Sequence, residues 1–282
     1  MKIMITGAHG MLGRTLTRRL KDHELLGVDI GDFDITDPGA VREAVTQFSP
    51  EAVIHCAAMT AVDDCQTNED AAWDVNVNGT ANIADACESV GARLIAISTD
   101  YVFSGDSDRP YNEMDTTGPQ TVYGMTKMMG EMAAVKYCPK SMIVRIAWLY
   151  GPGGPSFLHT MIRLAEEGMS PLKVVDDQIG NPTSTEAVAD HLKLLLKHPE
   201  ITGPVHLTCE GHATWCEFAA EIFRLIGSDC TPLPCSTSEF QRPAPRPANS
   251  QLDNLMLSKH NIAPMPHWRR ALEEFFQENP NR

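Results

Sequence analysis

The sequence predicts a doubly wound α/β fold, in which helices cover both faces of a parallel sheet, followed by a smaller C-terminal substrate-binding lobe. Two observations support this prediction. Short, continuously apolar segments alternate with amphipathic stretches through the first half of the chain, a pattern typical of buried parallel strands joined by helices. A glycine-rich turn directly follows the first apolar segment. Right-handed crossovers between such strands build a doubly wound sheet.

Five strands and their connecting helices are expected within residues 1–150, which we assign to the first domain. Asp37 and Pro38 form a typical helix start, because proline is favoured in the first helical turn. A later helix carries Tyr123 and Lys127. The predicted strands are 1–6, 25–29, 52–56, 94–98 and 141–147, and the other helices are 14–21, 37–48 and 68–90.

The regular alternation loosens after the Gly/Pro-rich segment 151–155. We expect a strand and a helix within about 172–200 to return to the first domain. The smaller lobe is then formed by residues 151–171 and 201–282. Helical spacing and apolar runs predict helices at 157–167, 186–196, 215–226, 252–260 and 267–276, and strands at 172–175 and 205–207.

Bulk composition disfavours several classes of protein. The chain has 282 residues and a net charge of −14, which disfavours nonspecific binding to nucleic acids and anionic membranes. None of the eight cysteines forms a C-x-x-C motif, so we expect reduced thiols in a cytoplasmic protein. We expect neither a secretory signal nor a membrane span. No H-E-x-x-H or Cys/His cluster offers a metal site.

Three glycines follow the first predicted strand at the spacing of a phosphate-binding turn. Gly7, Gly10 and Gly13 precede the first predicted helix, so the turn can be tight and the backbone can approach a pyrophosphate, which the helix N-terminus then binds. Asp29 ends the second strand, where an acid can hydrogen-bond the adenosine ribose. Together they predict a site for NADH or NADPH. Asp29 favours NADH, whereas a nearby cation such as Arg14 would allow NADPH.

Thr99, Tyr123 and Lys127 are the candidate catalytic residues. On one helix, Tyr123 and Lys127 share a face and lie about 6 Å apart along the axis. An ammonium near a phenol lowers the tyrosine pKa toward working pH, which makes a general acid for a developing alkoxide. Thr99 ends an apolar strand, so its hydroxyl can bond the same oxygen. A Tyr/Lys pair alone is usually ordinary helix surface, but the glycine turn and Asp29 upstream favour the catalytic interpretation.

Seven segments together resemble the dTDP-4-dehydrorhamnose reductase family of the extended short-chain dehydrogenase/reductases. Those at 98–103 and 246–250 are the specific ones, because many families share the glycine motif. The resemblance implies a Rossmann-type fold and NAD(P)H-dependent reduction of the 4-keto group of a dTDP-4-keto-6-deoxy sugar, most simply dTDP-4-dehydrorhamnose to dTDP-L-rhamnose. The matching segments are 7–13, 56–63, 98–103, 123–127, 147–151, 177–183 and 246–250.

The resemblance also implies the role of each site residue. Tyr123 would protonate the new hydroxyl, Lys127 would lower the tyrosine pKa and hold the nicotinamide ribose, and Thr99 would bond the carbonyl oxygen. The cofactor would contact Gly7, Gly10, Met11, Leu12, Gly13, Asp29, Asp34, Ile35, Ala58, Met59, Thr60, Tyr123 and Lys127. The sugar nucleotide would contact Thr99, Asp100, Trp148, Val62 and Arg246, the last of these through its diphosphate.

The chain departs from the family pattern in two respects. Met59 stands where the family often has histidine, so a hydrogen bond is lost there. Some members join subunits through a magnesium ion held by glutamates. Glu186 matches one of these ligands, but Arg14-Thr15 and Arg269-Arg270 stand where two others are expected. We therefore expect no metal, and either a monomer or a homodimer.

Two other functions stay open on the sequence alone. The chain could reduce a different nucleotide-linked 4-keto-6-deoxyhexose, because the motifs barely separate these substrates. It could also be a non-catalytic, cofactor-binding subunit that resembles the β subunit of methionine adenosyltransferase, although intact Thr99, Tyr123 and Lys127 favour an enzyme. A dehydratase is disfavoured because Asp100-Tyr101 supplies only the acid of an acid-base pair. A hydrolase is disfavoured because no G-x-S-x-G elbow is present.

Overall fold

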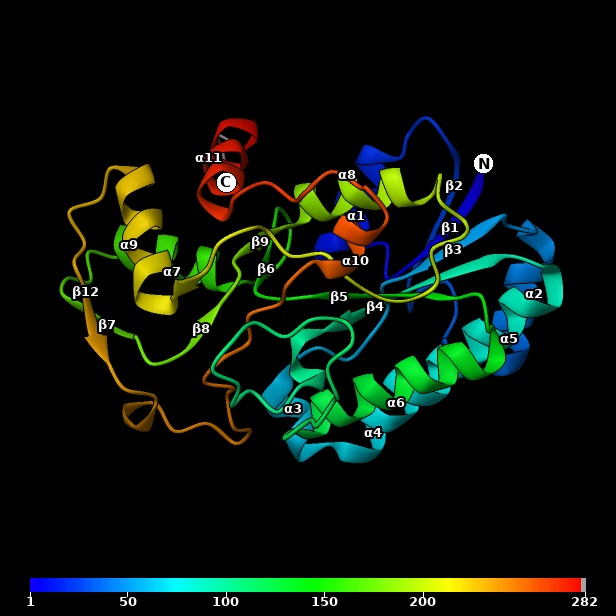
Figure 1. Cartoon of the computed structure of the whole chain (residues 1–282), viewed down its shortest axis with the longest axis horizontal. Coiled ribbons are helices and arrows are strands. Elements are labelled where there is room, and N and C mark those ends of the chain that lie inside the picture. Colours follow the sequence, from blue (N-terminus) through cyan, green and yellow to red (C-terminus); the bar gives the residue numbers. More distant parts are fainter. Residues whose placement is uncertain (280–282) are drawn as a thin grey trace.

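The computed structural model describes residues 1–279 and is built around a six-stranded sheet whose neighbouring strands are all parallel (Figure 1). The strand order is β10-β5-β4-β3-β1-β2. Because β2 and β3 lie on opposite sides of β1, the crossovers reverse direction there, which confirms the predicted doubly wound sheet. The strands are β1 (Lys2–Thr6), β2 (Glu24–Val28), β3 (Ala52–His55), β4 (Arg93–Thr99), β5 (Met142–Ile146) and β10 (Gly203–His206).

Alternate residues of the central strands pack on opposite faces of this sheet, as the two-residue period of a strand requires. Ile5 and Ile54 belong to one core, whereas Met4 and Val53 belong to the other. The first core is covered by α1 (Met11–Arg19) and α8 (Thr185–Leu195), which pack together. The second core is covered by α2 (Pro38–Phe48), α5 (Thr80–Val90) and α6 (Val122–Tyr137).

The helix predicted over 68–90 is present, but it is not uniform. α4 (Glu69–Trp73) joins α5 through a π-helical turn at Asp74–Gly79. π-helical turns inside α-helices often lie at functional sites. Here the turn packs against α6 and places a fully buried side chain, that of Asn76, between α6 and the loop after β3.

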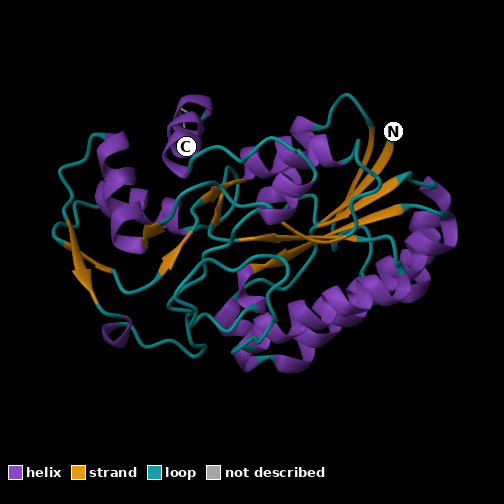
Figure 2. Cartoon of the chain, viewed as in Figure 1, coloured by secondary structure: helices purple, strands orange, loops and turns teal. Residues whose placement is uncertain are grey.

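The remaining elements form a second region, in which strands pair only in twos (Figure 2). We call it the small-sheet region. It contains the strand pairs β6 (Leu149–Tyr150) with β9 (Thr183–Ser184), β7 (Leu172–Val175) with β12 (Pro232–Cys235), and β8 (Ile179–Gly180) with β11 (Ala213–Thr214). Its helices are α7 (Phe157–Glu166), α9 (Trp215–Ile226) and α11 (Trp268–Glu278). Short helices α3 (Val62–Thr67) and α10 (Leu255–Lys259), and 3-10 turns at Asp100–Val102 and Thr237–Glu239, complete the fold.

The structure corrects the placement of two predicted strands. The strand at Leu172–Val175 was expected to return to the first domain, but it pairs with β12 in the small-sheet region. The segment that joins the main sheet is instead Gly203–His206, beside β5. The two strands differ in burial, because β10 buries both Val205 and His206 whereas β7 buries only Val174 and exposes Lys173. The helix expected near 186–196 does return, as α8.

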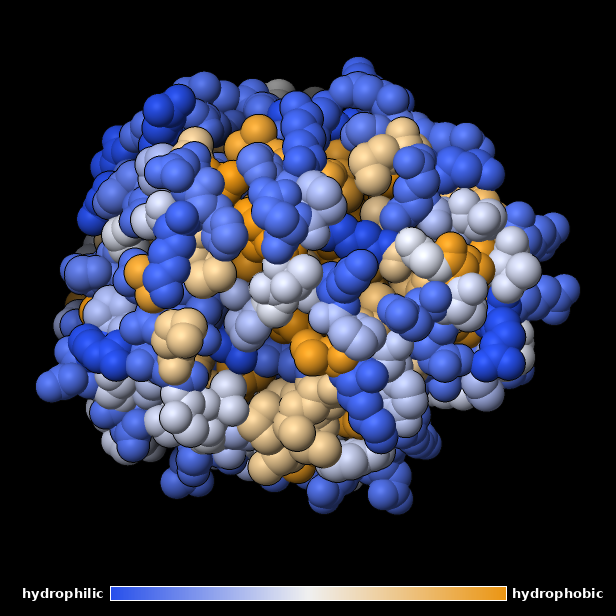
Figure 3. All heavy atoms as spheres, turned by 45° about the vertical axis from the view of Figure 1, so that its right-hand side comes forward, coloured by the Kyte–Doolittle hydropathy of each residue, from blue (hydrophilic) through white to orange (hydrophobic). Residues whose placement is uncertain are grey.

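Polar and charged residues cover much of the face seen in Figure 3, and apolar side chains appear there as separate patches. Among residues 1–279, no helix is both long enough and apolar enough to cross a membrane. All eight cysteines are free thiols.

Candidate active site

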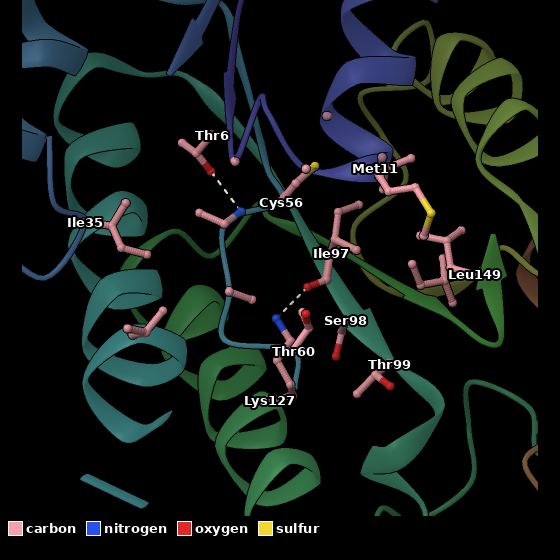
Figure 4. Close-up of a pocket in the computed structure, with 18 of the residues that line it drawn as sticks. Thr6, Met11, Ile35, Cys56, Thr60, Ile97, Ser98, Thr99, Lys127 and Leu149 are labelled. Carbon is pink, nitrogen blue, oxygen red and sulfur yellow. Dashed lines mark hydrogen bonds between the residues drawn. The ribbon is translucent and has the colours of Figure 1, made fainter. Parts of the chain in front are cut away.

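A cavity of about 590 Å³ lies where the main parallel strands end. Its lining includes Gly7 after β1, Asp29 after β2, Ala57 after β3, Thr99 at the end of β4 and Trp148 after β5. The carboxyl ends of parallel strands meet at one sheet edge, and a doubly wound fold binds ligands in the crevice at that edge. Figure 4 shows side chains from several of these strands around the same space. The fold therefore brings the predicted residues together.

The glycine turn forms a cradle that side chains would fill. Gly7 has a φ of 66°, and a Cβ there would lie 2.8 Å from the amide nitrogen of Ala57. A Cβ on Gly13 would lie only 2.2 Å from the carbonyl oxygen of Gly7. Gly10 donates its N–H to that same carbonyl at 3.0 Å. Because the first N–H groups of a helix have no intrahelical partner, the start of α1 presents free donors to this cradle.

The carboxylate of Asp29 is fixed at the end of β2 by the backbone. One oxygen accepts the N–H of His9 at 2.8 Å, and the other accepts the N–H of Ile30 at 2.9 Å. Asp32 accepts the N–H of Asp29 itself at 2.8 Å. Arg14, which could have neutralised a phosphate here, donates its Nε to the carbonyl of His9 at 2.7 Å. Two carboxylates therefore surround the end of β2.

A buried chain of hydrogen bonds links the first strand to the π-helical turn. The N–H of Ala57 donates to Thr6 Oγ1 (Figure 4), which lies 2.7 Å from His55 Nδ1. His55 Nε2 lies 3.1 Å from Thr80 Oγ1, which donates to the carbonyl of Asn76. Burial lowers the pKa of His55 to about 3. The neutral ring therefore carries its hydrogen on Nε2 and accepts from Thr6 at Nδ1.

Asn76 extends this chain to the helix that carries the catalytic candidates. Its Oδ1 accepts the N–H of Met59 at 2.9 Å, and its Nδ2 donates to the carbonyl of Met59 and to Thr126 Oγ1, each at 3.1 Å. Thr126 then donates to the carbonyl of Tyr123 at 3.0 Å. Sequence reasoning missed both His55 and Asn76, because each looks like an ordinary residue within an apolar or helical stretch.

Tyr123, Lys127 and Thr99 converge on the cavity, but their electrostatics differ from the expectation. Burial raises the pKa of Tyr123, and a hydrogen bond with Thr99 opposes that rise. Lys127 is not among the groups that shift this pKa; its Nζ donates to the carbonyl of Ile97 at 2.8 Å (Figure 4). The predicted lowering of the tyrosine pKa by lysine is therefore wrong for this structure. A raised pKa keeps the phenol protonated at neutral pH.

Lys127 is itself buried, and burial lowers its pKa to about 8. Glu131, one helical turn further along α6, opposes that shift. Glu131 is held by a buried ion pair with Arg145 at 2.7 Å and by the hydroxyl of Ser98 at 2.5 Å. This arrangement places a fixed negative charge behind the lysine, which favours its ammonium form.

Asp100 lies beside Thr99 in an unusual environment for a carboxylate. Thr99 Oγ1 donates to its Oδ1 at 2.9 Å, whereas its Oδ2 is buried and has no partner among residues 1–279. Burial raises the pKa of Asp100 to about 6, and the nearby hydroxyls of Thr99 and Ser250 limit the rise. The Asp100 carboxyl is therefore protonated more easily near neutral pH than an exposed aspartate.

The structure places most of the predicted binding residues at the cavity. All of the cofactor candidates except Met59 line it, and so do Thr99, Asp100, Val62 and Trp148. Met59 contributes its backbone to the Asn76 contact instead. Arg246 does not line the cavity; its Nη2 donates to Asp63 Oδ2 at 2.9 Å. Burial raises the pKa of Asp63, but the hydrogen bonds from Arg246 and from the N–H of Ala244, together with the positive charges of Arg246 and Arg242, lower it overall.

Among the positions compared with magnesium ligands, Glu186, Arg269 and Arg270 form ion pairs. Glu186 accepts from Arg18 at 2.9 Å. Arg269 lies 3.5 Å from Glu221, and Arg270 lies 2.8 Å from Glu274. Within residues 1–279, no three His, Cys, Asp or Glu side chains are grouped so that they could hold a metal ion.

Comparison with known proteins agrees with this geometry. The family model described as RmlD substrate binding domain matches residues 1–280. A dTDP-4-dehydrorhamnose reductase from Streptomyces griseus is 45% identical, with 97% of this chain and 92% of the relative covered. The crystal structure of a dTDP-4-dehydrorhamnose reductase from Clostridium acetobutylicum superposes with a TM-score of 0.96 at 44% identity, covering 99% of this chain and 100% of that one. One from Bacillus anthracis in complex with NADP has a TM-score of 0.96 at 38% identity, covering 98% and 99%. The chain therefore belongs to the dTDP-4-dehydrorhamnose reductase family.

Proposed function

We propose that this protein reduces the 4-keto group of dTDP-4-dehydrorhamnose to give dTDP-L-rhamnose, with NADH or NADPH as reductant. The observation that carries the proposal is the convergence of Thr99, Tyr123 and Lys127 on one cavity that also includes the glycine cradle. The chain's membership of the reductase family supports the same reaction.

The residues of this chain fit the proton half of the reaction. The bound nicotinamide supplies a hydride to the carbonyl carbon, and the oxygen then needs a proton. A tyrosine phenol is already protonated at neutral pH, and burial raises the pKa of Tyr123 further, so Tyr123 Oη holds the proton that the new alkoxide takes. The hydroxyl of Thr99 would give the same oxygen a second hydrogen bond once it turns away from Asp100 Oδ1, to which it donates in this structure. Lys127 keeps a positive charge beside the site.

The cofactor residues fit an adenine dinucleotide. The glycine cradle leaves room where any Cβ would collide with backbone, and a pyrophosphate suits the free N–H groups at the start of α1. Asp29 and Asp32 place negative charge at the end of β2, which favours NADH over the 2′-phosphate of NADPH. The relative from Bacillus anthracis was solved with NADP, so both reductants belong in the assay.

The sugar of the substrate would lie at the part of the cavity lined by Trp148 and Val62, because an indole ring packs well on the apolar face of a sugar. Arg246 is a candidate for the diphosphate, because a guanidinium matches phosphate oxygens. It must then exchange its bond to Asp63 for the substrate.

The test is oxidation of NADH and of NADPH by the purified protein, with enzymatically prepared dTDP-4-dehydrorhamnose as substrate and identification of the product. We expect stoichiometric oxidation and dTDP-L-rhamnose. A relative from Streptomyces niveus is named dTDP-4-keto-6-deoxy-D-glucose reductase at 38% identity, so that substrate is assayed in parallel. Cofactor binding without oxidation on either substrate would overturn the proposal and favour a regulatory subunit.

We also propose that the protein acts in the cytoplasm, as a monomer or homodimer. Free thiols at all eight cysteines suit a reducing compartment. Sedimentation of the purified protein measures the assembly, and a mass of three or more chains would contradict this proposal.

A further inference from the structure

Trp148 has a backbone conformation that costs free energy. Its φ is 45°, in the left-handed region that is uncommon for residues other than glycine and unfavourable for bulky side chains. It lies between β5 and β6, and its carbonyl accepts the N–H of Thr183 at 3.1 Å. Such strain persists only where the surroundings hold the residue in place, and it is concentrated at functional sites.

Three neighbours fix the indole ring of Trp148. Trp215 stacks on it with ring centroids 3.4 Å apart and planes 1° apart. Its Nε1 donates to Ser250 Oγ at 2.9 Å. Gly180 lies against its edge, where a Cβ would come within 2.4 Å of the ring. One face and part of the edge are therefore occupied by protein, which leaves the other face for a ligand.

Trp215 is well placed to act through Trp148, because it does not line the cavity itself. It begins α9, where the Thr214–Glu217 capping box fixes the helix start. Its Nε1 donates to Gln178 Oε1 at 3.0 Å, and the Phe157 ring lies 4.5 Å away on another helix. The stack is therefore anchored on α9, far along the chain from Trp148, and on α7, the next helix after β6.

We propose that Trp215 is a positioning residue for the substrate sugar. It holds the indole of Trp148 so that the free face of that ring receives the apolar face of a 6-deoxyhexose. This inference rests on the proposed function, because it needs a sugar in the cavity. A mobile indole loses conformational entropy when a sugar binds and orders it, which weakens binding. An indole that is already oriented by stacking loses less. Loss of the stack should therefore weaken sugar binding more than it slows the chemical step.

The test compares two substitutions at one position. Trp215→Leu removes the aromatic stack, and Trp215→Phe keeps a ring while losing the bond to Gln178. We expect Trp215→Leu to raise the KM for the sugar nucleotide about tenfold, with kcat changed less than about threefold and cofactor affinity unchanged. Trp215→Phe should have a KM close to that of the wild-type protein. Trp73→Leu, at a tryptophan on α4 that is 37% exposed and outside the cavity, is the matched control.

Gly180→Ala perturbs the same ring while Trp215 stays in place. Its Cβ would push the indole edge, so we again expect a raised KM. An unchanged KM in folded Trp215→Leu protein would overturn the proposal, and so would equal losses in the Leu and Phe variants.

A spectroscopic measurement separates this proposal from the proposed reaction. In protein labelled with 5-fluorotryptophan, the ¹⁹F resonance of Trp148 is assigned by Trp148→Phe. We expect the resonance to shift and change in width in Trp215→Leu, without any turnover being needed. If the wild-type protein reduces neither 4-keto sugar, the proposed function fails whatever this spectrum shows. An unchanged Trp148 resonance in Trp215→Leu would contradict the positioning role of Trp215, even if the enzyme is active.

Discussion

The two ends of the cavity are built in different ways. At the nucleotide end, the walls are backbone: Gly7 and Gly13 pack so closely that a Cβ on either would meet main-chain atoms. At the sugar end, large side chains are held by partners distant in sequence: Trp148, which lines the cavity, stacks on Trp215, and Arg246, which lies outside the lining, binds Asp63. A backbone cradle tolerates almost no substitution, whereas a set of side-chain contacts can be adjusted one residue at a time. Changes in specificity should therefore arise at the sugar end.

Tyr123 lies where the two ends meet, and its loss should have the largest effect. Tyr123→Phe removes the proton donor but keeps the ring that packs 5.5 Å from Tyr101. We expect kcat to fall about a thousandfold, within the range for loss of a general acid, while NADH and NADPH bind as before. Steady-state kinetics and cofactor titration measure both. A wild-type-like kcat would contradict the assignment.

Gly13→Ala tests the backbone cradle directly. The new Cβ would lie 2.2 Å from the carbonyl of Gly7, and backbone cannot yield as a side chain can. We expect the free energy of unfolding to fall by about 2 to 3 kcal/mol and cofactor affinity to fall with it, as measured by denaturant titration and cofactor binding. Gly31→Ala is the control, because nothing lies within 4 Å of its Cβ. Equal unfolding free energies and equal cofactor affinities in the two variants would contradict the role of Gly13 in the cradle.

Arg246→Met tests the sugar end of the cavity, and the matched control is a substitution of the neighbouring Arg242. Arg246 binds Asp63 at 2.9 Å and is 21% exposed, whereas Arg242 lies 3.9 Å away and is 59% exposed. If Arg246 exchanges Asp63 for the substrate diphosphate, the KM for the sugar nucleotide should rise about tenfold or more. Arg242→Met should change it less than about twofold. The diphosphate role is excluded if both variants have the wild-type KM.

Asp29→Ala tests whether a single side chain sets the preference for NADH over NADPH at the nucleotide end. Asp29 is fixed by the N–H groups of His9 and Ile30, and its carboxylate favours a ribose over a 2′-phosphate. We expect the affinity for NADH to fall about tenfold more than that for NADPH. Fluorescence titration with each reduced cofactor measures the ratio, and equal losses would show that the preference arises elsewhere.

The smallest expected effect is on stability and follows from Asp100. Burial raises its pKa to about 6, so the folded protein binds a proton more tightly than the unfolded chain does. This contribution favours folding at low pH and is lost as the pH rises through 6. Between pH 5 and 7 it amounts to about 1 kcal/mol. We expect Asp100→Asn to remove this slope when unfolding free energies are measured at both pH values; an identical slope would contradict the buried-carboxylate interpretation.

Much of the fold could be predicted because its signals are local. The parallel strands are continuous apolar runs, and the helix start at Asp37 is confirmed by its side chain, which accepts the N–H groups of Gly39 and Ala40. The position of Leu172–Val175 could not be predicted, because a short apolar run does not identify its pairing partner. Its partner, β12, lies beyond α9 in a segment rich in proline and serine.

The candidate site divides in the same way. Gly7, Asp29 and Tyr123 belong to motifs whose spacing carries the information, and all line the cavity. His55, Asn76 and Trp215 belong to no motif, because their importance comes from partners that only the tertiary structure supplies. The raised pKa of Tyr123 could not be predicted either, since it depends on burial rather than on the spacing to Lys127.

The place of β10 at the edge of the main sheet has a consequence for protein engineering. The chain leaves the sheet after β5, returns with α8 to pack on α1, and supplies β10 before leaving again. Grafting the sugar-binding end of a relative onto this scaffold therefore needs several junctions rather than one. A chain cut after β5 would expose that strand as an unprotected edge open to pairing with other chains, and it would strip α1 of its partner helix.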